Sequence, residues 1–224
     1  MFVLPFEIPE DENPGYYNFT IFVKLASSGI KVDTLELSVK VEYYADFTIT
    51  IVPAQSSGDP GFTHNFPVTI VNDANADEEI NFILDLPTGW TSCVLFSGNC
   101  LNSLNVAKGA TSEFTLQITT LDNEPANAVG VYLALVGKSS LNNNYEFSHD
   151  FKVMTNPTYI LSVDTPSNIK NGASGDTIPF QLMIKNLGND VDYVNLPSPV
   201  LPSGWTLSLI HISEPTRRYA ISYA

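Results

Sequence analysis

The sequence predicts an all-β protein made of tandem antiparallel sandwiches, and three observations support this. Apolar and β-branched residues alternate with polar ones at period two, as in Phe66–Asn72 and Phe114–Ile118, which is typical of half-buried strands. Clusters of Gly, Pro, Asn, Asp and Ser separate these runs, among them Ser56–Gly61 and Asn142–Asn144, and such residues favour turns. Blocks of sequence also recur at long range. We find no sustained helical period.

The recurring blocks define the size of one module. Phe66–Asn72 returns as Phe180–Asn186, an offset of 180 − 66 = 114 residues, and the motif Leu86–Trp90 returns as Leu201–Trp205. Phe47–Ile51 matches Tyr159–Val163 at an offset of 112. Solenoid repeats have periods of only roughly 20–50 residues. The chain is therefore expected to be an array of one whole-domain module.

The elements of the complete module follow from the alternating runs. Eight strands are expected, at residues 47–52, 65–72, 79–86, 90–96, 103–106, 112–120, 127–138 and 145–154. Seven or eight short strands with closely spaced turns indicate an immunoglobulin-like β-sandwich of roughly 100 residues. We accordingly expect four segments: the end of a preceding module at 1–44, the complete module at 45–156, the start of a following module at 157–206, and a tail at 207–224.

The tail does not read as native protein. Leu207–Arg217 (LSLIHISEPTR) and Ile221–Ala224 (ISYA) resemble one reading frame of a sequencing adapter. We expect residues 207–224 to be adapter-derived and the chain to be a gene fragment, and we exclude the tail from fold reasoning.

Composition limits the partners. The chain carries a net charge of −14 and 44% hydrophobic residues, enough for packed cores. An acidic surface repels phosphate backbones, so nucleic acid is not expected as a partner. No apolar run reaches the roughly 18 residues of a membrane helix, so no membrane contact is expected from this fragment.

Cys93 and Cys100 lie on either side of a turn signal, Gly98-Asn99. In an oxidising compartment they would form a small disulfide, and in a reducing one a pair of free thiols. We favour the disulfide.

The Leu-Pro-x-Gly-Trp motif is the strongest local pattern. Pro fixes φ before a turn and Gly permits positive φ. Trp90 either anchors this turn to the core or stacks on a sugar ring, and its recurrence at the same module position favours the structural role. The six residues of this turn motif are Pro87, Gly89, Trp90, Pro202, Gly204 and Trp205.

Residues suited to catalysis or metal binding form no recognisable constellation. His149 has the parity of apolar strand residues and reads as a core-edge histidine, and His64 stands in a loop approach without a partner in sequence. The acidic loops Asp73–Glu79 and Asn189–Asp192 hold oxygen ligands that suit calcium but lack a calcium-loop pattern, which favours solvated turns. We find no nucleophile elbow, HExxH, P-loop or dinucleotide motif. We therefore expect no enzyme activity, no cofactor and no metal.

The order of these motifs carries a family resemblance. Gly61-x4-Phe66-x-Val68-x-Ile70-x-Asn72 precedes Leu86–Trp90, then Val106-x-x-Gly109, then Val129–Tyr132. This pattern resembles the NPCBM-associated immunoglobulin-like domain of alpha-galactosidases and is similar to bacterial CARDB domains.

The resemblance implies a secreted or surface protein without catalytic residues in this region. We expect a stalk, adhesion or spacer segment of a large microbial surface protein, with further copies of the module as partners and a surface glycan or protein as a possible ligand. The alternative is an accessory region, carbohydrate-binding or not, of a secreted glycoside hydrolase or protease.

Overall fold

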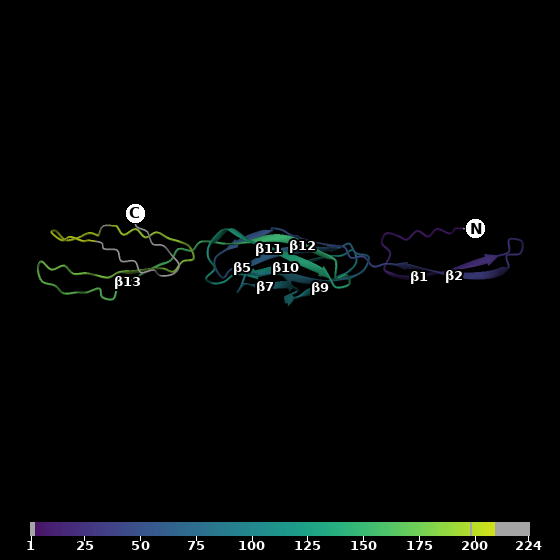
Figure 1. The fold of residues 1–224 in the computed structure, drawn as a ribbon, viewed down its shortest axis with the longest axis horizontal. Coiled ribbons are helices and arrows are strands. Elements are labelled where there is room, and N and C mark those ends of the chain that lie inside the picture. Colours follow the sequence, from purple (N-terminus) through teal and green to yellow (C-terminus); the bar gives the residue numbers. More distant parts are fainter. Residues whose placement is uncertain (1–2, 198, 209–224) are drawn as a thin grey trace. The chain divides into compact units, whose positions relative to one another are not determined.

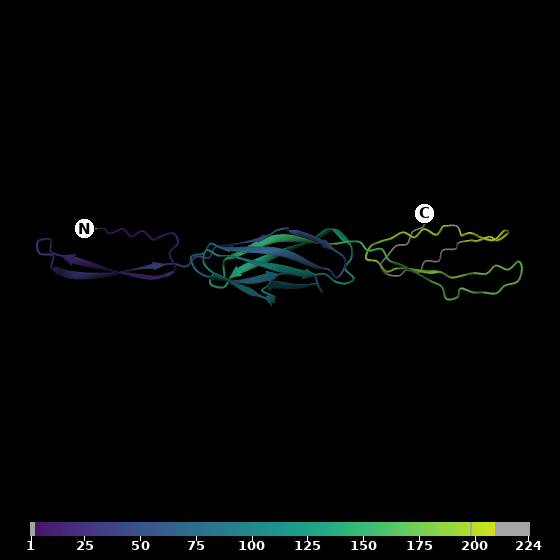
Figure 2. The ribbon, with the colours of Figure 1, turned by 180° about the vertical axis from the view of Figure 1, so that it is seen from behind.

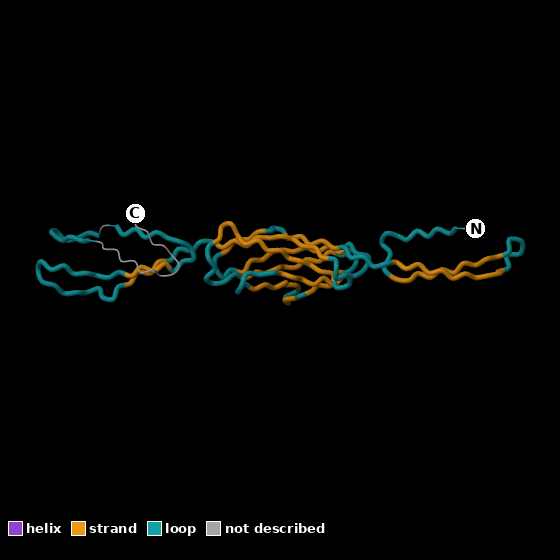
Figure 3. Tube along the Cα trace, in the orientation of Figure 1, coloured by secondary structure: helices purple, strands orange, loops and turns teal. Residues whose placement is uncertain are grey.

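The computed structural model describes residues 3–197 and 199–208. Its regular secondary structure in that range consists of β-strands, without a helix (Figures 1 and 3). Residues 209–224, most of the expected adapter-derived tail, lie outside the described residues. The strands are β1 (Gly15–Lys24), β2 (Lys31–Val41), β3 (Phe47–Ile51), β4 (Gln55–Gly58), β5 (Thr63–Asn72), β6 (Glu78–Leu84), β7 (Thr91–Phe96), β8 (Asn99–Leu101), β9 (Ser103–Val106), β10 (Thr111–Thr119), β11 (Asn127–Ser139), β12 (Glu146–Thr155), β13 (Leu161–Asp164) and β14 (Met183–Asn186).

Two compact units can be distinguished within the described residues. The first is drawn from residues 3–56, Thr63–Thr119 and Val131–Val153. The second is drawn from Ser57–Phe62, Thr120–Gly130 and the described residues 154–197 and 199–208. Each is described by itself below.

Strands β3 to β12 build two five-stranded sheets, visible in the middle of both ribbon views (Figures 1 and 2). Their strand orders are β3-β5-β10-β7-β8 and β4-β12-β11-β6-β9. This is an immunoglobulin-like antiparallel sandwich, as the sequence predicts. All eight strands expected between residues 47 and 154 are present, with ends within two residues of the predicted ones.

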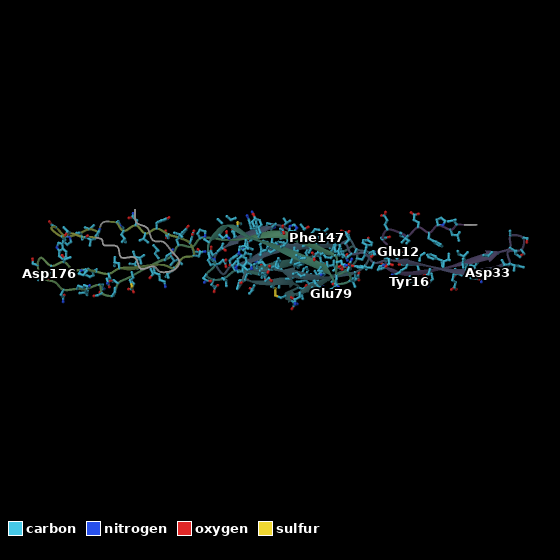
Figure 4. The ribbon with its side chains drawn as sticks, in the orientation of Figure 1. Glu12, Tyr16, Asp33, Glu79, Phe147 and Asp176 are labelled. Carbon is cyan, nitrogen blue, oxygen red and sulfur yellow. A yellow bond between two sulfur atoms is a disulfide. The ribbon has the colours of Figure 1, made fainter. Side chains whose placement is uncertain are left out.

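The core consists of the inward-facing residues of both sheets. Alternation is clear in β5, where every second residue is buried, and in β10, where Phe114, Leu116 and Ile118 are buried. Figure 4 shows side chains filling the central sandwich. The largest fully buried apolar side chains are Phe47, Ile49, Ile51, Phe66, Ile70, Ile80, Leu116, Ile118, Leu135 and Phe151.

Two strands were not expected from the sequence. β4 covers Ser56–Gly58, part of a cluster read as a turn. Its residues are small and polar, so they carry no β signal, yet Gly58 is buried and an added Cβ there would lie 2.3 Å from the Phe62 ring. β8 is only three residues long and pairs with β7 across the two-residue turn Ser97–Gly98.

The first strand pair of the third copy, β13 with β14, is equivalent to the pair β3 with β5 of the sandwich. In the sandwich Phe47 pairs with Asn72, and further along the chain Leu161 pairs with Asn186. Phe47 is therefore equivalent to Leu161, at an offset of 114. The sequence match of Phe47 to Tyr159 at 112 was wrong by two residues. A two-residue shift keeps the same face inward, so the apolar pattern alone does not reveal it.

The remaining strands form two small sheets. β1 and β2 form a long antiparallel hairpin in which Gly15 pairs with Val41, and β13 and β14 form a two-stranded sheet. Among the described residues no helix is long and apolar enough to cross a membrane.

Candidate functional site

The most organised polar structure in the first unit lies where the linker Glu42–Phe47 enters the sandwich. Asn75, only 2% exposed, accepts a hydrogen bond at Oδ1 from the Tyr44 amide (3.0 Å) and donates from Nδ2 to the Glu42 carbonyl (2.9 Å). One carboxamide thus binds a donor and an acceptor of the linker backbone.

Further groups of the sandwich hold the same linker. The Tyr43 hydroxyl lies 3.2 Å from the Ser139 hydroxyl. The Tyr145 hydroxyl donates to Asp46 Oδ1 (2.9 Å) and accepts from the Phe47 amide (3.1 Å), and burial raises its pKa. The Asp73 amide donates to the Asp46 carbonyl (2.8 Å).

Asn72 shapes the loop that carries Asn75. It is fully buried, and its Nδ2 donates to the carbonyls of Ala76 (3.0 Å) and Val106 (2.9 Å). Its Oδ1 accepts from the Ala74 amide (3.0 Å). Buried polar groups are stable only when they are hydrogen-bonded, and three of the bonds that Asn72 can form are made here.

The second unit contains the same arrangement. Asn189, 8% exposed, accepts at Oδ1 from the Thr158 amide (2.6 Å) and the Thr158 hydroxyl (3.0 Å). Its Nδ2 donates to the carbonyls of Asn156 and Glu124, both at 3.0 Å. Asn186 Nδ2 donates to the Asp190 carbonyl (2.7 Å) and its Oδ1 accepts from the Gly188 amide (2.9 Å).

Five of these bonds recur at an offset of 114. Asn75 with Tyr44 and Glu42 matches Asn189 with Thr158 and Asn156, and the Asp73–Asp46 bond matches Leu187 to Ile160. We call these two sets of residues the linker junctions. The sequence signal is Asn-x-x-Asn, present as Asn72–Asn75 and Asn186–Asn189. In the sequence, Asn72 and Asn186 end the two recurring strand blocks, and Asn75 and Asn189 belong to the acidic loops, so none of the four is predicted to bind a linker.

Several oxygens of the two acidic loops accept hydrogen bonds within the fold. Asp77 Oδ1 accepts from the Lys108 amide (2.9 Å). The Lys108 ammonium in turn contacts the Asp11 carbonyl and Asn13 Oδ1. Within residues 3–197 and 199–208, no three His, Cys, Asp or Glu side chains gather in a group that could hold a metal ion.

One acidic residue of this loop is buried. Glu78 is fully buried and neither carboxyl oxygen has a hydrogen-bond partner of suitable geometry. Burial raises the Glu78 pKa, and the nearby Ser139 hydroxyl offsets part of this increase. Burial away from water disfavours the charged form of a carboxyl, so ionisation of Glu78 would destabilise the folded state.

The two Leu-Pro-x-Gly-Trp turns have the same backbone geometry. The Trp90 and Trp205 amides donate to the carbonyls of Pro87 and Pro202, both at 3.1 Å. Gly89 and Gly204 have φ of 86° and 85°, a region that favours glycine. Trp90 is 6% exposed and lies in the core, so it presents no face to a sugar ring, whereas Trp205 is 70% exposed.

Cys93 and Cys100 form a disulfide that joins β7 to β8 at the edge of one sheet. The turn between them places Ser97 and Gly98 at positive φ, 50° and 82°, which suits a two-residue hairpin. A groove lies beside the disulfide and is lined in part by Phe82, Leu84, Leu101 and Asn102.

The two histidines among the described residues, His64 and His149, both lie on strands. The sequence predicts His64 in a loop approach, and this is wrong. His64 lies in β5, fully buried, with Nδ1 2.9 Å from the Ser56 hydroxyl. Burial lowers its pKa. This partner, Ser56, is not predictable from the sequence because it lies on β4, a strand that the sequence does not indicate. His149 is half-buried on β12, with the parity of its apolar neighbours.

No protein-family model and no curated protein matches the chain. Among solved structures, it is similar to a FixG-related protein from Vibrio parahaemolyticus, at 8% identity and a TM-score of 0.38, over 50% of this chain and 95% of that one. It is also similar to BcpA, the major pilin subunit of Bacillus cereus (10%, TM-score 0.33, 78% and 63%). Domains 4 and 5 of the S-layer protein SbsC match at 18% identity and a TM-score of 0.30, over 64% and 66% of the two chains.

Proposed function

We propose that this chain is a non-catalytic spacer segment of an extracellular surface protein, in which successive immunoglobulin-like modules set the distance between functional parts. The observation that carries the proposal is the recurrence, at one offset of 114 residues, of both the β3–β5 pairing and the hydrogen bonds of the linker junction. A module that repeats with its junction is suited to building length.

One feature supports an extracellular setting. The Cys93–Cys100 disulfide is a bond that persists in oxidising compartments and is rare in the cytosol. Separately, the net charge of −14 favours solubility and opposes self-association. The specific family, NPCBM-associated or CARDB, and an adhesive role remain part of the proposal.

Single-molecule force spectroscopy tests the spacer function. The sandwich runs from Phe47 to Thr155, which is 155 − 47 + 1 = 109 residues. With the disulfide intact, its unfolding should lengthen the chain by roughly 340–370 Å, less the folded end-to-end distance, at 3.3–3.6 Å per residue. Reduction of the disulfide, whose cysteines are 7 residues apart with Cα atoms 5.2 Å from each other, should add roughly 20 Å. Gradual extension without a discrete event would refute a module that resists stretching as one cooperative unit.

A binding assay distinguishes the spacer from a carbohydrate-binding accessory module. The purified chain, with its disulfide intact, would be applied to a glycan array and to insoluble polysaccharides. The spacer function predicts no retention. Saturable binding would contradict it. Loss of that binding on Tyr132→Ala, an exposed side chain on the outer face of the sandwich, with retention on Trp90→Phe, would locate the ligand there.

A further inference from the structure

We infer that the paired asparagines of the β5–β6 loop, and of its counterpart after β14, are an interaction surface whose partner is the backbone of the preceding linker, so that each linker is fixed to the module that follows it. The inference deepens the proposed spacer function and rests on that function for its mechanical consequence.

The division of labour within each pair supports this. The first asparagine, Asn72 or Asn186, bonds to the backbone of its own loop and sets the loop conformation, and Asn72 also donates to the Val106 carbonyl at the end of β9. The second, Asn75 or Asn189, bonds to backbone that lies 31 to 65 residues earlier in the chain. Its side chain is nearly or fully enclosed in both copies.

The chemistry of the side chain matches the target. A linker strand offers alternating N–H donors and C=O acceptors, and a carboxamide is the neutral side chain that supplies one acceptor and two donors. Asn75 takes Tyr44 N–H and Glu42 C=O, two residues apart, and Asn189 takes Thr158 N–H and Asn156 C=O at the same spacing. The bonds that both copies share go to backbone groups, and the Thr158 hydroxyl is an additional partner in the second copy. The shared bonds therefore allow the linker sequence to vary, as Glu42–Tyr44 and Asn156–Thr158 do.

Each junction also has a contact with the loop that precedes the last hairpin of the earlier copy. In the second unit Asn189 Nδ2 reaches the Glu124 carbonyl, and the Ala126 amide donates to the Asn189 carbonyl (3.1 Å). In the first unit Lys108 reaches Asp11 and Asn13 instead. Attachment at two places resists bending more than attachment at one. The second junction has more side-chain bonds from its asparagine, four against two, and should be the firmer.

Amide hydrogen exchange of the full chain, measured by NMR, tests the inference, because each junction is the control for the other. In the wild-type protein the Tyr44 and Thr158 amides should exchange at least tenfold more slowly than in unfolded peptides of the same sequence. Asn75→Ala should abolish protection of Tyr44 and leave Thr158 unchanged. Asn189→Ala should do the reverse and should also raise the backbone mobility of residues 156–160 in ¹⁵N relaxation.

Aspartate variants separate the two halves of the contact. Asn189→Asp keeps an acceptor for Thr158 but loses the donors to Asn156 and Glu124, so Thr158 should stay protected while linker mobility rises. The inference is overturned if either amide is unprotected in the wild-type chain, or if each alanine variant accelerates both amides equally, as general destabilisation would. Such a failure would leave a spacer with flexible joints, whereas glycan binding would remove the spacer function and leave the fixed linkers.

Discussion

Replacing Asn72 by alanine should lower the free energy of unfolding of the sandwich more than a substitution at any exposed position. This is expected although the Asn72 side chain is polar and lies next to a loop. Asn72 is fully buried at the end of β5 and makes three hydrogen bonds of 2.9 to 3.0 Å. A net hydrogen bond contributes about 1 kcal/mol, and a buried partner left without one costs about 1–3 kcal/mol.

The expected loss follows from the partners that alanine would leave. The Val106 carbonyl and the Ala74 amide belong to buried residues, whereas the Ala76 carbonyl is partly accessible to water. Two buried orphans and one hydrated group give a loss of about 3 kcal/mol in the free energy of unfolding. Because folded domains have only about 5–15 kcal/mol in total, this is a large fraction.

Denaturant unfolding, followed by fluorescence of the buried Trp90, would measure the loss as a lower midpoint at unchanged slope. Asn186→Ala is the matched control: it removes the equivalent bonds to Asp190 and Gly188 in the third copy and should leave the sandwich transition in place. A loss below about 1 kcal/mol for Asn72→Ala would refute the reasoning, since it would mean that water replaces the buried bonds.

The strands of the sandwich were predictable because burial on one face imposes period two on the sequence. Phe114, Leu116 and Ile118 alternate in the chain and are all buried in the structure. The register of the third copy was not predictable in the same way. Phe47 can be aligned with Tyr159 or with Leu161 without changing which face of the strand is apolar. Only the pairing of Leu161 with Asn186 shows that Leu161 is the equivalent residue.

The linker junctions escaped sequence reasoning for a different reason. Asn75 and Asn189 bond to backbone atoms, which every residue carries, so their partners leave no mark in the sequence. Asparagine is also a common turn former, and that simpler interpretation accounted for both loops. The recurrence of Asn-x-x-Asn in two copies was the available signal, because turn formation alone does not require the same residue twice at the same spacing.

Three further changes should have measurable effects. Replacing Cys93 and Cys100 together by serine should lower the free energy of unfolding by about 2 kcal/mol, as expected from loop-closure entropy for a short loop, and a loss indistinguishable from zero in a denaturant titration would show that the hairpin holds without the disulfide. Trp90→Ala should destabilise the sandwich by about 3–5 kcal/mol, while Trp205→Ala, at an exposed residue, should leave its transition unchanged; equal effects would contradict the core position of Trp90. Glu78→Gln should change the pH dependence of stability. Burial raises the Glu78 pKa above its ordinary value of 4.5, so the folded state favours the protonated form. Its stabilising contribution is fully present below the unfolded pKa and is lost as pH rises through the folded pKa. Glutamine does not ionise, so the variant should match the wild type near pH 4 and be the more stable of the two at pH 7, as measured by thermal unfolding at both values. A wild type that equals or exceeds the variant at pH 7 would mean that the Glu78 carboxylate is stabilised by a donor, most directly Ser139, and is not merely enclosed.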